Sequence, residues 1–302
     1  MRVFLAGATG AIGRPLVDRL LADGHSVVGT TRDAARAEDL RARGVEPVVL
    51  DAFDAEAVRA AVVAAAPDVV VHQLTALPDQ PDPRRMAASV EATSRLRRET
   101  VPTFVAAARD AGARRVVVQS ISFATRPDGR PVHDEDAPLD PEQDAVAALE
   151  AATTGAEGIE GIVLRYGFYY GAGTWYDRDG AIATVIRTRR YPLIGTADGR
   201  SSFVHVDDAV DATVRALDRG APGIYNVCGD EPLPQRVWLP EAARLLGAKP
   251  PRRAPAWLAR RLAGDAVVHY ATTLPGNAND RARAAFDWRP RPWREGFAEV
   301  FG

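Results

Sequence analysis

Short apolar runs alternate with segments of helical periodicity from the first residues of the chain onward. Residues 3–6, 26–29 and 47–50 have the length and composition of buried strands, and residues 12–21 and 34–43 have apolar positions at helical spacing. The alternation continues with strands at 68–71 and 115–118 and with helices at 55–66 and up to Gly112. Uniformly apolar strands are typical of a parallel sheet covered on both faces. The pattern therefore predicts an α/β fold with a Rossmann-type, doubly wound parallel sheet.

The pattern becomes less regular after Tyr166, where glycine, proline and aromatic residues are frequent. One regular unit then returns, with a strand at 202–205, a helix at 207–219 and a strand at 224–227. We therefore expect a larger domain at residues 1–166, to which residues 202–228 return. The remaining segments, 167–201 and 229–302, are expected to form a smaller C-terminal α/β domain.

The composition limits the kinds of partner that the protein can have. The 302 residues include 38 basic and 40 acidic side chains, so no overall basic field favours nucleic acid or an anionic membrane. A small molecule is the expected partner. The longest apolar run, residues 60–71, is interrupted by Pro67 and Asp68 and is too short to span a bilayer. Cys228 is the only cysteine and no charged-then-apolar leader precedes Val3, which together predict a cytoplasmic protein.

A glycine-rich segment follows the first strand and opens the first helix. Its glycines allow a sharp turn and a close approach to a pyrophosphate, whose negative charge is favoured by the free N–H groups of a helix N-terminus. The spacing Gly-x-x-Gly-x-x-Gly in this context predicts a dinucleotide site. The residues assigned to it are Gly7, Thr9, Gly10, Ile12 and Gly13. A tight strand-to-helix turn without a ligand is the alternative.

The end of the second strand bears on the choice of cofactor. Thr31 and Arg32 stand where the adenosine ribose is expected, and an acidic residue there would instead favour a free 2′-hydroxyl. Because an arginine can bind a 2′-phosphate, the sequence favours NADP(H) over NAD(H). The neighbouring Asp33 weakens this inference, and a solvated position at a helix start is the alternative for Arg32.

Further cofactor contacts are expected after the third and fourth strands, at the edge where ligands bind in open α/β sheets. Asp51 and Ala52 follow the third strand, and Leu74 and Thr75 follow the fourth. Asp51 could accept a hydrogen bond from an adenine amino group, and a role as a cap or turn residue is an equal alternative. His72 is interpreted as a buried structural residue.

The chain resembles, along nearly its whole length, the extended short-chain dehydrogenase/reductases of the NAD(P)-dependent epimerase/dehydratase type. The resemblance rests on the glycine motif, on PDVVVH at 67–72, on LRYG at 164–167 leading to YG at 170–171, on FVHVDDA at 203–209 and on WRP at 288–290. It implies an oxidoreductase in which residues 164–170 pass the nicotinamide, with Tyr166 in the cofactor site, while the C-terminal part binds a small-molecule substrate. It also implies that Asp207 caps a helix and that a homodimer forms through the long helices.

The motif on which the chemistry of this family depends is not found at its expected place. In the family, a tyrosine followed four residues later by a lysine exchanges a proton with substrate, because the ammonium lowers the pKa of the phenol. Aligning residues 149–150 with the Ala-Glu that usually follows the motif puts Glu142 at the tyrosine position and Val146 at the lysine position. Lys249 is the only lysine of the chain, so no small shift restores the pair. Ile121 similarly takes the place of the usual serine.

Hydroxyl groups near the expected nicotinamide are the candidates for a replacement. Ser120, Ser122, Tyr166 and Tyr169 are therefore assigned as candidate catalytic residues. A phenol without a neighbouring cation keeps a pKa of about 10 and is a better acid than base, so reduction is the direction least impaired. A place in the wall of an apolar pocket is the alternative for each tyrosine. The five histidines show no metal-ligand spacing, so no metal site is predicted.

The sequence leaves three functional hypotheses open. The first is an NADP-dependent oxidoreductase or epimerase/dehydratase-like enzyme that acts on a small organic substrate with a non-standard proton donor. The second is a non-redox isomerase, cyclase or dehydratase on the same fold. The third is a catalytically silent NADP(H)-binding protein. Aromatic and arginine residues between 175 and 190 favour an aromatic or acidic substrate.

Overall fold

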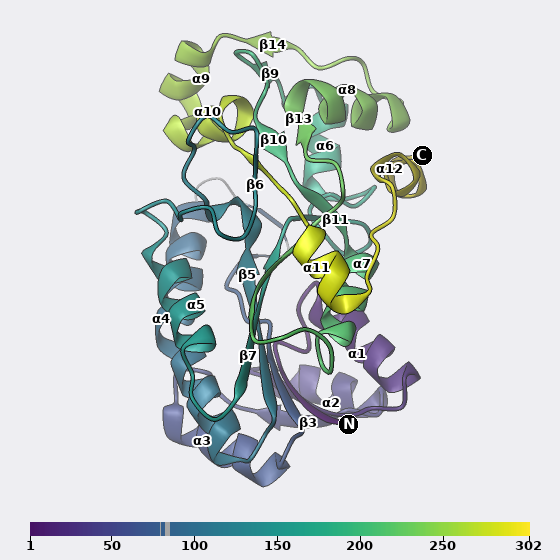
Figure 1. The fold of residues 1–302 in the computed structure, drawn as a ribbon. Helices are drawn as coiled ribbons and strands as arrows, with labels where there is room; N and C mark the ends of the chain where they lie inside the picture. The colour runs from purple at the N-terminus through teal and green to yellow at the C-terminus, as the bar shows by residue number, and fades with distance from the viewer. Residues whose placement is uncertain (79, 82–84) are drawn as a thin grey trace.

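A seven-stranded parallel sheet forms the centre of the protein, in a computed structural model that describes residues 1–78, 80–81 and 85–302 (Figure 1). Its strands are β1 (Arg2–Ala6), β2 (Ser26–Thr31), β3 (Glu46–Val49), β4 (Val69–His72), β5 (Arg115–Ile121), β7 (Glu160–Tyr166) and β12 (Gly223–Val227). They lie in the order β12-β7-β5-β4-β1-β2-β3, so the direction of winding reverses between β1 and β4. The predicted doubly wound topology is confirmed, and ligands bind such sheets at this reversal, outside the carboxyl ends of the strands.

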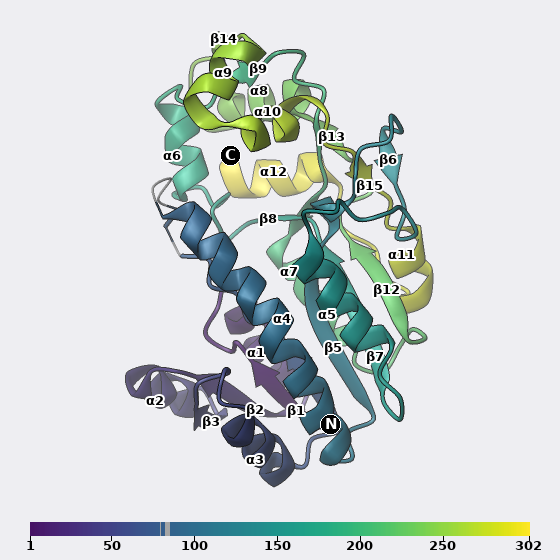
Figure 2. The same ribbon diagram turned by 90° about the vertical axis from the view of Figure 1, so that its left-hand side faces the viewer.

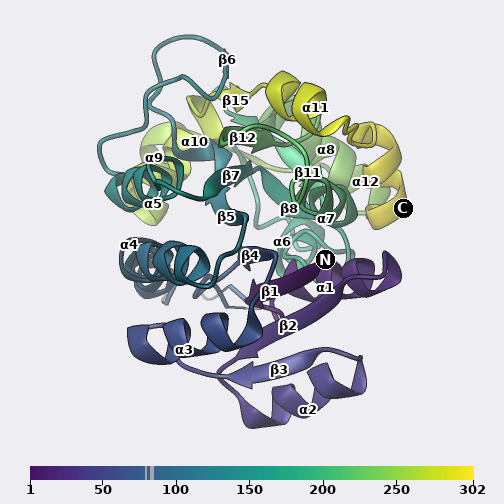
Figure 3. The same ribbon diagram turned by 60° about the horizontal axis from the view of Figure 1, so that its bottom comes forward.

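Helices cover both faces of this sheet, as Figure 3 shows. One face is covered by α1 (Gly13–Ala22), α2 (Ala34–Ala42) and α7 (Val206–Arg215), and the other by α3 (Ala55–Ala65), α4 (Met86–Asp110) and α5 (Asp144–Thr154). Successive side chains of a strand point to opposite faces, so Val3 and Leu5 join one core while Phe4 and Ala6 join the other. Because both faces are buried there, the central strands β1 and β4 are almost entirely apolar.

A smaller group of elements lies beyond the carboxyl ends of the sheet strands (Figures 1 and 2). Its helices are α6 (Ala181–Arg187), α8 (Gln235–Leu245), α9 (Ala256–Ala263), α10 (Asp265–Thr272) and α12 (Trp293–Phe301). Short strands pair within it, β9 (Leu193–Ile194) with β14 (Arg253–Ala254) and β10 (Arg200–Ser201) with β13 (Leu233–Pro234). Its core is aromatic, with the rings of Trp238 and Phe297 centred 5.2 and 5.3 Å from that of Phe203.

Short elements connect the sheet with this smaller group. Only Gly167 separates β7 from β8 (Phe168–Tyr170), which pairs in parallel with β11 (Phe203–His205). A 3₁₀ turn, η1 (Ser122–Ala124), follows β5, and β6 (Val132–His133) pairs with β15 (Gly276–Asn277), which leads to α11 (Asp280–Phe286). Within residues 202–228, α7 and β12 lie on the large sheet, whereas β11 forms a separate two-stranded sheet with β8.

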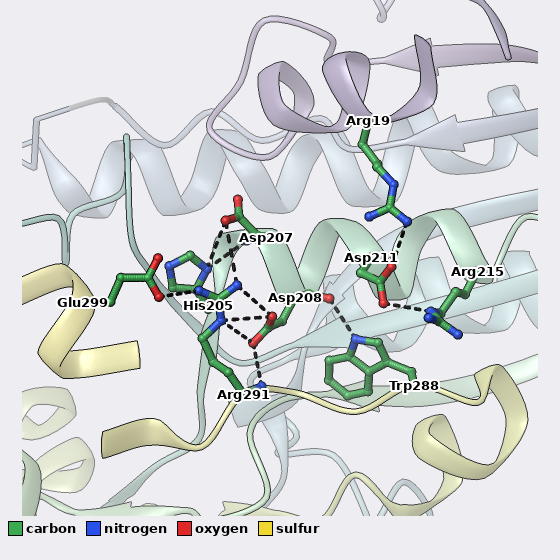
Figure 4. Close-up of polar contacts among 9 residues, drawn as sticks. All are labelled: Arg19, His205, Asp207, Asp208, Asp211, Arg215, Trp288, Arg291 and Glu299. Atoms are coloured by element: carbon green, nitrogen blue, oxygen red, sulfur yellow. Dashed lines mark hydrogen bonds and ion pairs between the residues drawn. The ribbon is translucent and has the colours of Figure 1, made fainter. Parts of the chain in front are cut away.

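Asp208 holds the C-terminal segment against α7, as Figure 4 shows. Its carboxylate accepts hydrogen bonds from the backbone N–H and the Nε of Arg291, at 2.9 and 3.1 Å, and its carbonyl accepts one from Trp288 Nε1 at 3.0 Å. The preceding residue, Asp207, lies in the first turn of α7 and does not cap it. The cap is His205, whose Nδ1 accepts the Asp207 N–H at 3.1 Å. The expected cap at Asp207 is wrong because α7 already begins at Val206, which puts Asp207 inside the first turn.

Candidate functional site

The loop between β1 and α1 forms an open cradle of backbone groups. Gly7 has a φ of +95°, a left-handed conformation that favours glycine, and a Cβ there would lie 3.0 Å from the Gln73 backbone. A Cβ at Gly13 would collide with the Gly7 carbonyl oxygen. Among the described residues no side chain caps α1 at Ile12, and the first turn holds no acidic residue. The helix N-terminus is therefore available to an anion, which fits the pyrophosphate of a dinucleotide.

Basic side chains surround an open hollow beside this cradle. The hollow has a volume of about 200 Å³ and lies between the glycine loop, α1 and α2. Its lining residues are Thr9, Arg14, Arg36, Asp39, Leu40 and Arg43. Three guanidinium groups therefore border the space next to the glycine loop, which favours a ligand with negative charge in addition to the pyrophosphate.

Arg32 lies exposed directly after β2, in the position that the sequence assigned to the cofactor ribose. Its neighbour Asp33 caps α2, because its side chain accepts the Ala35 N–H at 2.9 Å. The Asp33 N–H in turn donates to Thr31 Oγ1 at 3.1 Å. Asp33 thus has a structural role at the helix start, and Arg32 is the charged residue of this turn without such a role among the described contacts.

The residues assigned after β3 and β4 lie at the same edge of the sheet. The Asp51 carboxylate accepts the Phe53 N–H at 3.1 Å and so stabilises a turn, while the side chain remains exposed. Of the other three, Ala52 is buried, Leu74 is half-buried and Thr75 is exposed. This geometry fits both the turn role of Asp51 and a hydrogen bond to an adenine amino group, because the turn uses only one of its carboxylate oxygens.

Ser120 and Tyr166, two of the candidate catalytic residues, lie on opposite faces of the sheet. The Ser120 hydroxyl is buried toward α5 and donates to Glu150 Oε1 at 3.2 Å. Tyr166 points toward α7, where its hydroxyl is 2.7 Å from Thr213 Oγ1 and accepts from Gln73 Nε2 at 3.0 Å. Burial raises the pKa of Tyr166 to about 12. Both hydroxyls are therefore engaged within the protein, and the sheet keeps them apart.

Ser122 and Tyr169 differ from this first pair, because their buried hydroxyls have no hydrogen-bond partner among the described residues. Ser122 follows β5 and is fully buried, and Tyr169 lies in β8 with its ring 5.4 Å from that of Tyr166. The Oε1 atom of Gln73, directly after β4, is also buried without a described partner. Unpaired buried polar atoms are rare in native proteins and call for an explanation such as a ligand. Gln73 and Tyr169 both contact Tyr166 beyond the ends of β4 and β7, and Ser122 follows the end of the neighbouring strand β5.

An aromatic cluster stands next to these polar groups. Phe123 follows Ser122 in the chain and stacks on Phe168, with the ring centroids 4.4 Å apart. Tyr270 of α10 packs edge-on against both rings at 6.2 Å. The smaller group of elements therefore brings an aromatic side chain to the ends of β5 and β8, and flat apolar walls of this kind suit an aromatic ligand.

Arg97 of α4 is a buried cation that sequence reasoning missed. The residue is 8% exposed, its Nε has no hydrogen-bond partner, and no described carboxylate lies within ion-pair distance of it. Burial lowers the pKa of its guanidinium to about 10, so the group is still charged at neutral pH. The sequence did contain a signal for it: Arg97 is a charged residue at helical spacing from Thr93, Thr100 and Phe104, which form the buried stripe of α4.

The start of α5 carries the two residues that the alignment puts in place of the family's pair. Glu142 lies exposed before the helix, and Val146 is fully buried within it. His133, in the acidic loop that precedes α5 in the chain, is buried with its two ring nitrogens 2.9 Å from Thr125 Oγ1 and Asp128 Oδ1. The imidazole is therefore occupied within its own loop.

Across residues 1–78, 80–81 and 85–302, no three histidine, cysteine or acidic side chains come together as a metal site. In the same part of the chain, no helix combines the length and the apolar character that crossing a membrane requires.

Comparison with known proteins gives a relative of high identity. A 3-diazoavenalumate denitrifying reductase from a Streptomyces species is 50% identical over 308 residues, which cover 98% of this chain and 99% of that protein. The likeness therefore extends over both chains nearly from end to end.

Solved structures with the same fold have lower sequence identity. A UDP-glucose 4-epimerase from Thermotoga maritima, solved with UDP-glucose, has a TM-score of 0.79 at 18% identity and covers 100% of this chain and 97% of its own. A dTDP-glucose 4,6-dehydratase from Streptomyces venezuelae, solved with NAD, has a TM-score of 0.77 at 21% identity, with 100% and 96% covered. At such identities the likeness shows the fold alone. The family model described as the NAD dependent epimerase/dehydratase family matches residues 3–228, from β1 through β12. The chain belongs to this family, whose members are oxidoreductase-like enzymes.

Proposed function

We propose that this protein is an NADPH-dependent reductase that removes the diazo group of an aromatic carboxylic acid as N₂, by hydride transfer to the ring carbon. The proposal rests above all on the 50% identity with the 3-diazoavenalumate denitrifying reductase over 98% of the chain. The name of that relative specifies a diazo group on an organic acid anion and a reduction that removes nitrogen. The Phe123–Phe168 stack supports an aromatic substrate.

This reaction suits a site without a tyrosine–lysine pair. The hydride brings the electron pair of the new carbon–hydrogen bond, and the electrons of the broken carbon–nitrogen bond leave with N₂. A diazonium ion thus becomes a neutral arene, and no proton has to be supplied. Reduction of a carbonyl, in contrast, needs a proton on the oxygen, which is the task of the family's tyrosine. Glu142 and Val146 at the motif positions are consistent with chemistry that needs no such donor.

The residues at the strand ends would bind and orient the two reactants. Residues 7–13 would hold the pyrophosphate, and a bound nicotinamide would supply the hydride. Gln73, Ser122 and Tyr169, whose buried polar atoms lack described partners, would contact the nicotinamide or the substrate. Burial raises the pKa of Tyr169 well above its usual value, so the phenol stays protonated and acts as a hydrogen-bond donor.

The preference for NADPH is supported by the arginines around the first two helices. Arg32 follows β2, and Arg14 and Arg36 line the hollow beside Thr9. A 2′-phosphate adds negative charge in this region, and guanidinium groups bind phosphate through directed, charge-assisted hydrogen bonds. Of the two acidic residues nearby, Asp33 caps α2 and Asp39 lines the hollow together with the arginines.

The test is a single-turnover reaction with 3-diazoavenalumate and NADPH deuterated at C4 of the nicotinamide. We expect N₂ and NADP⁺ in equal amounts, with the deuterium on the ring carbon that carried the diazo group. In a parallel reaction with unlabelled NADPH in D₂O, we expect no deuterium at this carbon. Deuterium taken up from D₂O, or product formed without cofactor, would contradict hydride transfer and favour the non-redox hypothesis. Tight binding of NADPH without turnover would favour a silent binding protein.

Gly13→Ala provides the loop variant for this test, because its Cβ collides with the Gly7 carbonyl oxygen. We expect loss of NADPH binding and of deuterium transfer, with the secondary structure retained by circular dichroism. Ala22→Ser, at the exposed far end of the same helix, is the matched control and should keep both. Deuterium transfer by Gly13→Ala at the unmodified rate would show that the loop is not the cofactor site.

A further inference from the structure

Arg97 stands apart from two other buried arginines of the chain in having no described partner. Arg115 donates to Glu160 and to the Ala216 carbonyl, each at 2.8 Å, and Arg165 donates to both oxygens of Glu150. The Arg97 side chain makes no such contact with a described residue, and its Nε is buried. An unpaired buried charge destabilises a fold, so its presence suggests a partner that arrives from outside.

The contacts of its helix place Arg97 at the carboxyl end of β4. One turn before it, Thr93 Oγ1 accepts the Ala76 N–H at 3.0 Å. One turn after it, Thr100 Oγ1 lies 2.9 Å from His72 Nε2. Arg97 occupies the same buried stripe of α4, between Thr93 and Thr100, level with the segment after β4. That segment includes Gln73, whose Oε1 has no described partner. The guanidinium therefore belongs to the region where the free polar groups gather.

Among the described residues, no carboxylate is available to neutralise this cation. Glu150 is the acidic group that acts on Arg97 electrostatically, yet Arg165 binds both of its oxygens, at 2.6 and 2.7 Å. Tyr270 also acts on Arg97, and it is a phenol of α10 whose ring packs against the Phe123–Phe168 stack. A guanidinium that no described carboxylate neutralises thus lies near Tyr270 of the aromatic cluster.

We infer that Arg97 binds the carboxylate of the substrate beside the aromatic cluster of Phe123, Phe168 and Tyr270. The inference rests on the proposed function for the identity of the substrate as an aromatic acid, and it assigns the residue that selects the acid over its neutral analogues. A guanidinium binds a carboxylate through two parallel hydrogen bonds, and a site built for a charged group rejects a ligand that leaves it unpaired. Because the cation repels a diazonium group, the carboxylate end of the substrate faces Arg97 and the diazo end faces away.

The experiment compares two unreactive probes of the same shape, trans-cinnamate and trans-cinnamamide, by calorimetric titration of the NADP⁺-loaded enzyme. We expect the unmodified enzyme to bind cinnamate about tenfold or more tightly than the amide. Arg97→Met should bring this ratio close to one, and Arg97→Lys should retain part of it. Arg95→Met changes an exposed arginine of the same helix that pairs with Glu99 at 2.9 Å, and it should keep the full ratio.

Thermal unfolding separates binding from folding in these variants. Arg97→Met should unfold at the same or a higher temperature, because it removes an unpaired buried charge. The inference is overturned by a ratio that survives Arg97→Met, or by an unmodified enzyme that binds neither probe or both equally. Selectivity that depends on Arg97 without any denitrification would keep the anion site and reject the proposed reaction. Denitrification together with a selectivity that survives Arg97→Met would keep the proposed reaction and reject the anion site at Arg97.

Discussion

The Arg165 guanidinium binds both carboxylate oxygens of Glu150, with Nε and Nη2 at 2.6 and 2.7 Å, where α5 packs against β7. Both side chains are almost fully buried. Ser120 of β5 donates to the same carboxylate at 3.2 Å, and Arg165 also donates to the Glu135 carbonyl at 3.1 Å. The pair therefore joins α5, β5, β7 and the loop before α5 directly beside the candidate site.

Glu150→Ala is expected to destabilise the protein by about 3–5 kcal/mol, because it leaves the Arg165 charge buried without its partner. Replacing both residues, as Glu150→Leu with Arg165→Met, should recover much of this loss, since neither charge remains. Chemical denaturation followed by circular dichroism measures the free energy of unfolding of each variant. A double variant as unstable as Glu150→Ala would show that lost packing, and not the unpaired charge, causes the effect. Glu99→Ala, which breaks an exposed ion pair with Arg95, should cost about 1 kcal/mol or less.

Arg32→Ala is expected to weaken NADPH binding by about 1.5–3 kcal/mol, the range for hydrogen bonds to charged groups, and to leave NADH binding nearly unchanged. Calorimetric titration of nucleotide-free protein with each cofactor measures the difference. Arg41→Ala is the matched control, because Arg41 is an exposed residue of α2 that pairs with Glu38 at 2.6 Å. Equal losses for NADPH and NADH would rule out contact between Arg32 and the 2′-phosphate.

Stability should fall below about pH 6.5 because of His72. The residue is 1% exposed, and burial lowers its pKa to about 4. The unfolded chain takes up a proton near pH 6.5, whereas the folded protein resists it until about pH 4. Stability that is complete above pH 6.5 is therefore lost as the pH falls through this window, by about 3 kcal/mol at most.

His72→Gln removes this titrating group and should flatten the dependence of stability on pH between 6.5 and 4. Denaturant titrations at several pH values measure the slope. Some slope should remain, because burial also lowers the pKa of His205. A slope identical to that of the unmodified protein would mean that His72 titrates alike in the folded and unfolded states.

Local sequence signals were sufficient for the strand and helix pattern and for the doubly wound topology. The predicted strands and helices correspond to β1 to β5 and α1 to α4 of the structure. They were predictable because each element buries a face that its own periodicity defines. The ends of elements were less predictable. Residues 216–219 were expected to extend α7, yet the helix ends at Arg215, and a strand expected near Ser202 pairs with β8 outside the large sheet. Strand pairing depends on distant partners that a local pattern does not contain.

The sequence by itself predicted a dinucleotide site at the glycine loop and at Arg32, because each of these predictions depends on a short contiguous segment. From its single lysine, the sequence also predicted that the usual tyrosine–lysine pair is missing from its expected place. Only the tertiary structure separated Ser120 and Tyr166 to opposite faces of a sheet. It also left the buried hydroxyls of Ser122 and Tyr169 without a partner among the described residues. It likewise brought Arg97 to the end of β4. Whether a polar side chain is free or already paired depends on neighbours far away in the chain, so folding alone decides it.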